Sequence, residues 1–122
     1  MSSVVTASGK HLLADFYGVA AAPLKDAAFL ERLLREAAQQ AGARVLSSHF
    51  HVFGDEEGVT GVVLLSESHI SIHTWPESGF AALDIFMCGS AHPERALRYA
   101  TRELRPNGQL VTQTERGKTA KP

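Results

Sequence analysis

The sequence predicts an α+β fold, a two-layer α/β sandwich in which a largely antiparallel sheet carries two helices on one face. The chain has 122 residues, of which 44% are hydrophobic and 20% are charged, as in one globular domain. Two segments have the apolar spacing of helices, and four strand-like segments lie between them. Hairpin-length connections join these middle strands, which favours antiparallel pairing. We therefore treat residues 1–122 as a single domain.

The chain is expected to begin with a loose leader and a first strand. Residues 1–8 form the leader, and the strand is Lys10–Tyr17, which contains two leucines and two aromatic residues. The small residues 18–22 connect this strand to the first helix.

The segment Leu24–Ala41 predicts a helix. Its apolar residues recur three or four positions apart and make one apolar face: Phe29, Leu30, Leu33, Leu34, Ala37 and Ala38. Pro23 lies where its fixed φ suits the first turn of this helix. Gly42 follows as a stop signal.

The middle of the chain predicts four strands. Ala43–Phe53 and Val59–Ser66 flank an acidic, glycine-bounded turn. His69–Trp75 alternates strictly, with Ile70, Ile72 and Thr74 on one face and His69, Ser71, His73 and Trp75 on the other. Phe80–Cys88 is the fourth strand, and its odd-numbered and even-numbered positions face opposite ways.

The end of the chain predicts a second helix and a last strand. Ser90 can cap the helix, Pro93 lies near its start, and the apolar stripe consists of Ala96, Leu97, Ala100 and Leu104. Residues 106–108, Pro-Asn-Gly, end it. Gln109–Glu115 alternates weakly and is expected to be a strand.

Charge and cysteine content exclude several classes of protein. The net charge of −1 does not indicate nucleic acid or an anionic membrane as the main partner, and the short basic tail 116–122 is expected to be solvated. Cys88 is the only cysteine, so an intrachain disulfide is impossible. No membrane-spanning run or signal peptide is apparent, and we expect a cytoplasmic protein.

Reactive side chains concentrate between His49 and Cys88. This stretch holds four of the six histidines, the only cysteine and the only tryptophan. No cysteine or carboxylate lies at a recognised ligand spacing from these histidines, so no metal site is predicted. A nucleophile elbow, a phosphate-binding loop and a dinucleotide fingerprint are all absent from the sequence. The residues alone indicate a possible active site around Ser68, His73 and Cys88, with Asp84 either an acid or a paired structural charge.

Two sequence blocks carry a family resemblance. Leu65–Glu77 reads LSESHISIHTWPE, and Gly79–Gly89 reads GFAALDIFMCG. Both resemble the self-cleavage and active-site segments of the bacterial and archaeal S-adenosylmethionine decarboxylase proenzymes. Shorter matches at 9–12, 50–53, 58–62 and 115–117 extend the resemblance over nearly the whole chain.

The resemblance implies that the chain cuts itself between Glu67 and Ser68, giving 1–67 as the beta chain and 68–122 as the alpha chain. Ser68 would become a pyruvoyl group, the covalent cofactor. The chemistry requires a strained, held peptide bond, a donor to the oxyanion and a base for the α-proton. His73 matches the family's proton-transfer residue in processing, and Thr60 matches a serine hydroxyl that assists the same step.

The resemblance also implies roles in decarboxylation. The substrate amine would form a Schiff base with the pyruvoyl carbonyl, and Cys88 would return a proton to the α-carbon. Phe53 would stack on the adenine, Glu77 would bind the ribose hydroxyls and Trp75 would wall the pocket. The alternatives are core packing for the two aromatic residues and a plain turn position for Glu77.

The expected product is decarboxylated S-adenosylmethionine, the aminopropyl donor for spermidine, and the expected assembly is a homodimer of cleaved protomers. Two other functions stay open at this point. Some relatives decarboxylate arginine or ornithine through the same group, and a homologue that no longer cleaves itself could only bind nucleosides. A histidine-rich metal-binding domain is a third reading. The sequence does not reveal whether a diamine or a metal activates the enzyme.

Overall fold

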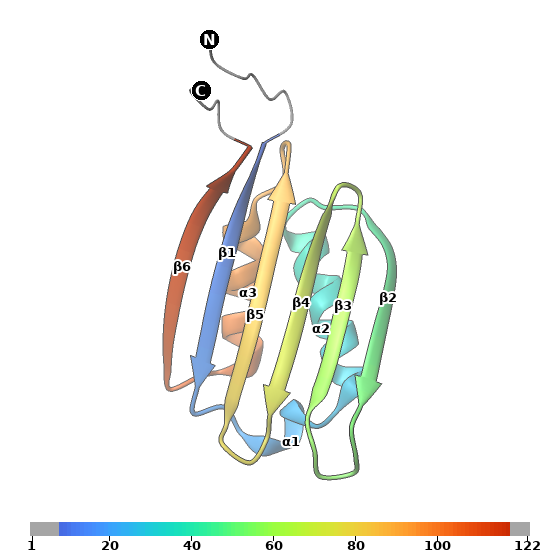
Figure 1. The fold of residues 1–122 in the computed structure, drawn as a ribbon, viewed down its shortest axis with the longest axis vertical. Coiled ribbons are helices and arrows are strands. Elements are labelled where there is room, and N and C mark those ends of the chain that lie inside the picture. Colours follow the sequence, from blue (N-terminus) through green and yellow to red (C-terminus); the bar gives the residue numbers. More distant parts are fainter. Residues whose placement is uncertain (1–7, 118–122) are drawn as a thin grey trace.

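The computed structural model describes residues 8–117 and contains one six-stranded sheet with three helices (Figure 1). The sheet order is β2-β3-β4-β5-β1-β6, and every neighbouring pair is antiparallel. In chain order the elements are β1 (Gly9–Tyr17), α1 (Ala21–Leu24), α2 (Ala27–Gln40), β2 (Val45–Val52), β3 (Val59–Leu65), β4 (Ser68–Trp75), β5 (Phe80–Cys88), α3 (Pro93–Leu104) and β6 (Gly108–Arg116). The predicted α+β sandwich is confirmed.

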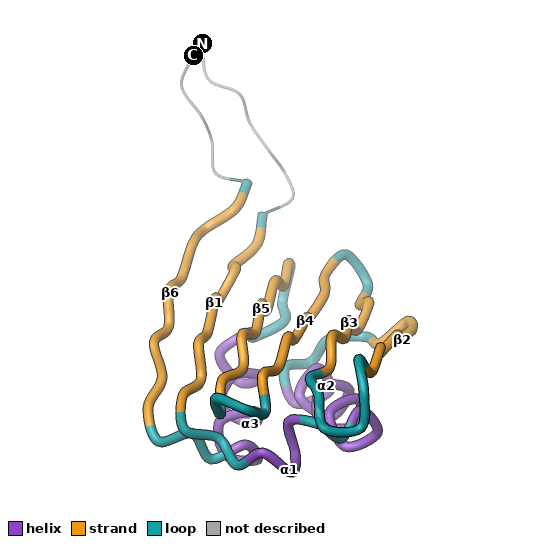
Figure 2. Tube along the Cα trace, turned by 60° about the horizontal axis from the view of Figure 1, so that its bottom comes forward, coloured by secondary structure: helices purple, strands orange, loops and turns teal. Residues whose placement is uncertain are grey.

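The helices all lie on one face of the sheet (Figure 2). Alternate residues of β3, β4 and β5 point to this face and are buried, including Val63, Ile70, Ile72, Leu83 and Ile85. The apolar stripe of α2 packs against them through Leu30, Leu33 and Leu34. The alternation predicted for β4 and β5 is therefore confirmed, and the core is a single layer between sheet and helices.

The start of the first long helix differs from the prediction. Pro23 lies inside the four-residue α1, and α2 begins at Ala27. Asp26 caps α2, because its Oδ1 accepts a hydrogen bond from the Phe29 N–H at 3.0 Å. The predicted end is confirmed, since the helix stops at Gln40 and Gly42 takes a φ of 81°.

The second long helix also begins later than the predicted cap. His92, not Ser90, occupies the N-cap position of α3, and its side chain makes no capping hydrogen bond. Pro93 is the first helical residue, as its fixed φ allows. The hydroxyl of Tyr99 on α3 donates a hydrogen bond to the carboxylate of Glu36 on α2, which raises the pKa of Tyr99.

The predicted leader lies almost entirely in 1–7, outside the described residues.

The opposite face of the sheet is covered by no element within residues 8–117 (Figure 2). It carries large apolar side chains that are at least two-fifths exposed: Leu13, Tyr17, Leu64, Trp75 and Leu110. We call this surface the open face. No helix among the described residues is long and apolar enough to cross a membrane.

Thr74 anchors α1 to the sheet from the buried side of β4. Only 5% of this residue is exposed. Its hydroxyl donates to the Leu24 carbonyl at 2.6 Å and accepts from the Val59 N–H at 2.9 Å. One side chain thus satisfies two backbone groups that are shielded from water.

Replacing Thr74 by valine is expected to destabilise the fold by about 1–3 kcal/mol, because two buried backbone groups lose their partner. Urea unfolding followed by circular dichroism measures the change. Thr112→Val on the exposed strand β6 is the matched control and is expected to leave the midpoint unchanged. Equal midpoints for the two variants would contradict this account of Thr74.

Candidate active site

The reactive side chains form two groups at opposite ends of β4. Ser68 is the first residue of this strand and Trp75 is the last. The group at the Ser68 end contains Ser68 and Cys88, and we call it the serine–cysteine group. The group at the other end contains Thr60, His73 and the aromatic residues Phe53 and Trp75, and we call it the histidine pocket.

A tight hairpin positions the serine–cysteine group. Leu65 pairs with Ser68, so only Ser66 and Glu67 connect β3 to β4. The Cys88 N–H donates a hydrogen bond to Ser68 Oγ at 3.1 Å, which fixes the orientation of the hydroxyl. Cys88 is the last residue of β5, carries a free thiol and is half-buried, as Ser68 is.

Gly9 makes room for the Cys88 side chain from the neighbouring strand. The two residues are paired between β1 and β5. A Cβ on Gly9 would lie 2.7 Å from the Met87 carbonyl oxygen and 3.0 Å from Cys88 Sγ. Sequence reasoning used Gly9 only within the family match at 9–12. The signal that could have indicated this contact is a glycine inside a strand, where another group can approach closely.

The histidine pocket begins with one cross-strand pair. Thr60 on β3 lies opposite His73 on β4, and Thr60 Oγ1 is 3.1 Å from His73 Nδ1. A pocket of about 440 Å³ surrounds this pair, lined also by Phe53, Trp75 and Glu77. The five residues that the sequence assigned to Ser68 processing or to substrate binding at this end are therefore brought together.

Phe53 and Trp75 are not core residues. Phe53 is 59% exposed and Trp75 is 42% exposed. The Trp75 ring lies 5.2 Å from the Phe80 ring, and the Phe53 ring contacts His51 edge-on at 4.8 Å. Both therefore present aromatic surface to the pocket instead of filling the interior, which removes the core-packing alternative.

One chain does not bring His73 to Ser68. Both residues lie on β4, and five steps of an extended strand at about 3.3 Å each separate them by roughly 17 Å. The group that the residues indicated around Ser68, His73 and Cys88 is thus divided: Ser68 lies with Cys88, and His73 lies with Thr60.

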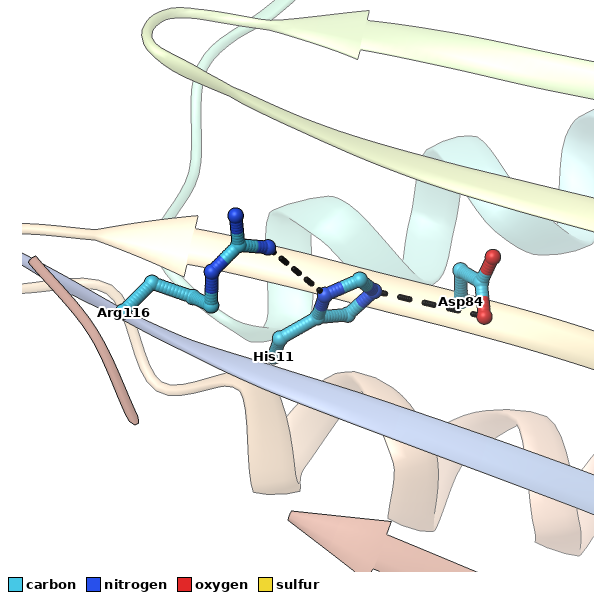
Figure 3. A network of polar contacts seen from close by, with 3 residues as sticks. All are labelled: His11, Asp84 and Arg116. Carbon is cyan, nitrogen blue, oxygen red and sulfur yellow. Dashed lines mark hydrogen bonds and ion pairs between the residues drawn. The ribbon is translucent and has the colours of Figure 1, made fainter. Parts of the chain in front are cut away.

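A polar network that sequence reasoning missed lies on the open face beside the serine–cysteine group. Figure 3 shows His11 between Asp84 and Arg116. His11 Nδ1 is 3.5 Å from the Arg116 guanidinium, and Nε2 is 4.0 Å from Asp84 Oδ1, too far for a direct hydrogen bond. Because arginine only donates, His11 Nδ1 acts as the acceptor and Nε2 carries the proton.

The His11 ring is packed as well as paired. It lies 5.6 Å from the Phe86 ring and 6.2 Å from the His69 ring, and the Arg116 guanidinium covers Phe86 at 5.8 Å. The geometry gives Asp84 a neighbour in His11 but no direct hydrogen bond, so both sequence readings of Asp84 stay open. Three strands contribute to the network, so no local sequence pattern could have predicted it.

The histidines do not converge on one point. Within residues 8–117, no group of three or more histidine, cysteine or acidic side chains is placed to hold a metal ion. His49 lies opposite Val62, and His51 lies opposite Thr60.

Comparison with known proteins gives one consistent result. The model of the S-adenosylmethionine decarboxylase family matches residues 10–117. The S-adenosylmethionine decarboxylase proenzyme of Acetivibrio thermocellus is 42% identical over 119 residues, which cover 97% of this chain and 95% of that protein. The proenzyme of Moorella thermoacetica is 44% identical over 112 residues, or 91% of this chain and 89% of that one. The crystal structure of the adenosylmethionine decarboxylase from Aquifex aeolicus superimposes with a TM-score of 0.84 at 40% identity, covering 94% and 93% of the two chains.

Replacing Gly9 by alanine is expected to displace the Cys88 side chain, because the new Cβ would overlap backbone and thiol together. The cost in folding free energy is about 1–3 kcal/mol, as for other overpacked sites. We expect a lower urea midpoint and a changed rate of thiol labelling at Cys88. Gly108→Ala, whose Cβ meets nothing within 4 Å, is the control. A Gly9→Ala protein with unchanged labelling and midpoint would contradict the assignment.

Proposed function

The chain belongs to the S-adenosylmethionine decarboxylase family, and we propose that it cuts itself between Glu67 and Ser68 into segments 1–67 and 68–122. It is a pyruvoyl-dependent enzyme that converts S-adenosylmethionine into carbon dioxide and decarboxylated S-adenosylmethionine, the aminopropyl donor of spermidine biosynthesis. The arginine, ornithine and binding-only alternatives are not favoured. The observation that carries the proposed cut is the hydrogen bond from the Cys88 N–H to Ser68 Oγ at the hairpin.

Self-cleavage begins at the Ser68 hydroxyl. Its oxygen attacks the Glu67 carbonyl carbon, the carbon–nitrogen bond breaks, and the hydroxyl proton moves to the nitrogen, so that an ester replaces the amide. A base then removes the Ser68 α-proton, and the bond from Cβ to the ester oxygen breaks. Segment 1–67 leaves with a terminal carboxylate. Uptake of one water and loss of ammonia convert the remainder of Ser68 into a pyruvoyl group.

The residues around Ser68 fit a pyruvoyl group at this position. A backbone N–H is directed at the Ser68 oxygen, and the Cys88 side chain, which Gly9 leaves room for, belongs to the same residue as that N–H. The pyruvoyl carbonyl supplies the electron sink for decarboxylation. Cys88 holds a proton on its thiol and returns it to the substrate α-carbon, the role that the family motif assigns to this position.

The histidine pocket holds the rest of the substrate. The exposed rings of Phe53 and Trp75 offer stacking surfaces for the adenine and attract the sulfonium cation. The Glu77 carboxylate accepts hydrogen bonds from the ribose hydroxyls, and Glu57 adds negative charge to the same pocket. These two carboxylates suit a cationic nucleoside.

A second copy of the chain completes the site. His73 and Thr60 serve Ser68 chemistry only if they come from another protomer, because the separation along β4 is roughly 17 Å. In a twofold dimer, the histidine pocket of each copy meets the serine–cysteine group of its partner. The open face, with its exposed apolar side chains, provides the surface for this association. We also propose a cytoplasmic location, which suits the single free thiol.

The parent protein is expected to give two chains split after Glu67, the second with a blocked N-terminus, and Ser68→Ala is expected to stay whole and inactive. Intact-mass spectrometry and release of labelled carbon dioxide measure both. The cleaved protein should release carbon dioxide from S-adenosylmethionine and not from arginine. An uncut, inactive parent, or release from arginine alone, would overturn the proposed function.

Mixed dimers test the division of the site between two copies. Ser68→Ala and His73→Ala chains, distinguished by tags of different mass, are each expected to remain essentially uncut alone. When they are expressed together, the mixed dimer contains one site with Ser68 and His73 both intact, so the His73→Ala chain is expected to be cut. Absence of that cut in isolated mixed dimers would show that each site is built within one chain.

A further inference from the structure

Two non-glycine residues among the described residues have a positive φ, Glu67 at 64° and Arg105 at 49°. Left-handed backbone is unfavourable for residues with a Cβ, and glycine, asparagine and aspartate are the usual occupants. Arg105 lies at the C-cap of α3, where such a conformation is common. Glu67 lies instead in the β3–β4 hairpin, at a turn position that favours glycine or asparagine, and it contributes the acyl side of the proposed scissile bond.

The hairpin leaves Glu67 no relaxed alternative. Leu65 and Ser68 are paired, so Ser66 and Glu67 must reverse the chain, and of these two only Glu67 has a positive φ, at the turn position where glycine or asparagine is usual. The turn is also held from both sides. The Ser66 N–H donates to the Arg44 carbonyl at 3.0 Å, and Ser68 Oγ accepts from the Cys88 N–H at 3.1 Å.

From this conformation we infer that backbone strain at Glu67 accelerates self-cleavage, which makes Glu67 a positioning residue for that reaction. The inference rests on the proposed function, since it concerns the same bond. An unfavourable backbone conformation persists only where its surroundings impose it, and it raises the energy of the uncut chain. When the ester forms and segment 1–67 is released, Glu67 is no longer the second residue of a closed two-residue turn. The strain is lost along the reaction and therefore lowers the barrier.

The carboxylate of Glu67 takes no part in the backbone strain. The side chain is exposed, and none of the hydrogen bonds or ion pairs found among residues 8–117 involves its carboxylate. A residue that relaxes the backbone and a residue that only removes the charge are therefore expected to act differently. Arg105 supplies a control with the same kind of strain far from the cut.

Cleavage is timed by cell-free translation of labelled proenzyme, with uncut and cut chains separated on gels. Glu67→Gly and Glu67→Asn, which tolerate positive φ, are expected to slow cleavage by roughly two- to tenfold. Glu67→Gln, which keeps the strain and loses the charge, is expected to slow cleavage less than Glu67→Gly does. Arg105→Gly is expected to leave the cleavage rate unchanged.

A second measurement separates strain from a folding defect. In the uncleavable Ser68→Ala background, Glu67→Gly is expected to raise the urea midpoint, as Arg105→Gly does, although only Glu67→Gly slows the cut. If Glu67→Gln slows the cut as much as Glu67→Gly, or if Glu67→Gly cleaves at the parent rate, the inference is wrong and the proposed function stands. A parent chain that is never cut would overturn both.

Discussion

The pairing register of β4 between β3 and β5 is the constraint on which the rest of the molecule depends. It places Thr60 opposite His73, and it brings the start of β4 to the end of β5, where Ser68 meets the Cys88 N–H. A slip of one residue would turn Ile70 and Ile72 toward water and His73 into the core. The buried apolar residues of β4 therefore fix the positions of the reactive ones, because both alternate along the same strand.

This alternation also explains why one sheet face is left open. The helices cover the face that carries the core, and His73 of β4 and Cys88 of β5 occupy the other face with Leu13, Tyr17 and Leu64. Ser68, at the edge of the core face, pairs with buried Leu65 and reaches Cys88 at the end of the sheet. A sheet that faces water on one side normally shows polar residues there. The mixture of apolar and reactive side chains on the open face is what an interface containing a shared active site requires. The alternation along the strands therefore accounts for both the uncovered sheet face and the proposed two-copy site.

The features that could be predicted from the sequence are those with a local physical signal. Strict alternation identified the faces of β4, and spacing of three and four identified α2. The predicted start of α2 was wrong because it relied on Pro23, and proline suits the first turn of any helix. The side chain of Asp26 supplies the actual cap. The His11 network depends on β1 lying between β5 and β6, and pairing between distant strands leaves no local signal. The closeness of Ser68 and His73 in sequence was equally misleading, since five residues span roughly 17 Å on a strand and only about 7.5 Å on a helix.

The position of the proposed cut is compatible with survival of the fold. It falls at the junction of a two-residue turn and β4, so the break interrupts neither the ladder of β3 with β4 nor the core side chains on either strand. After the break, β4 stays paired with β5 on its other edge, and Thr74 still bonds to Leu24 and Val59 from the other segment. The two segments are thus held by the hydrogen bonds and apolar contacts that hold the uncut chain. The hairpin can carry a strained, reactive peptide bond because nothing else in the structure depends on that bond remaining closed.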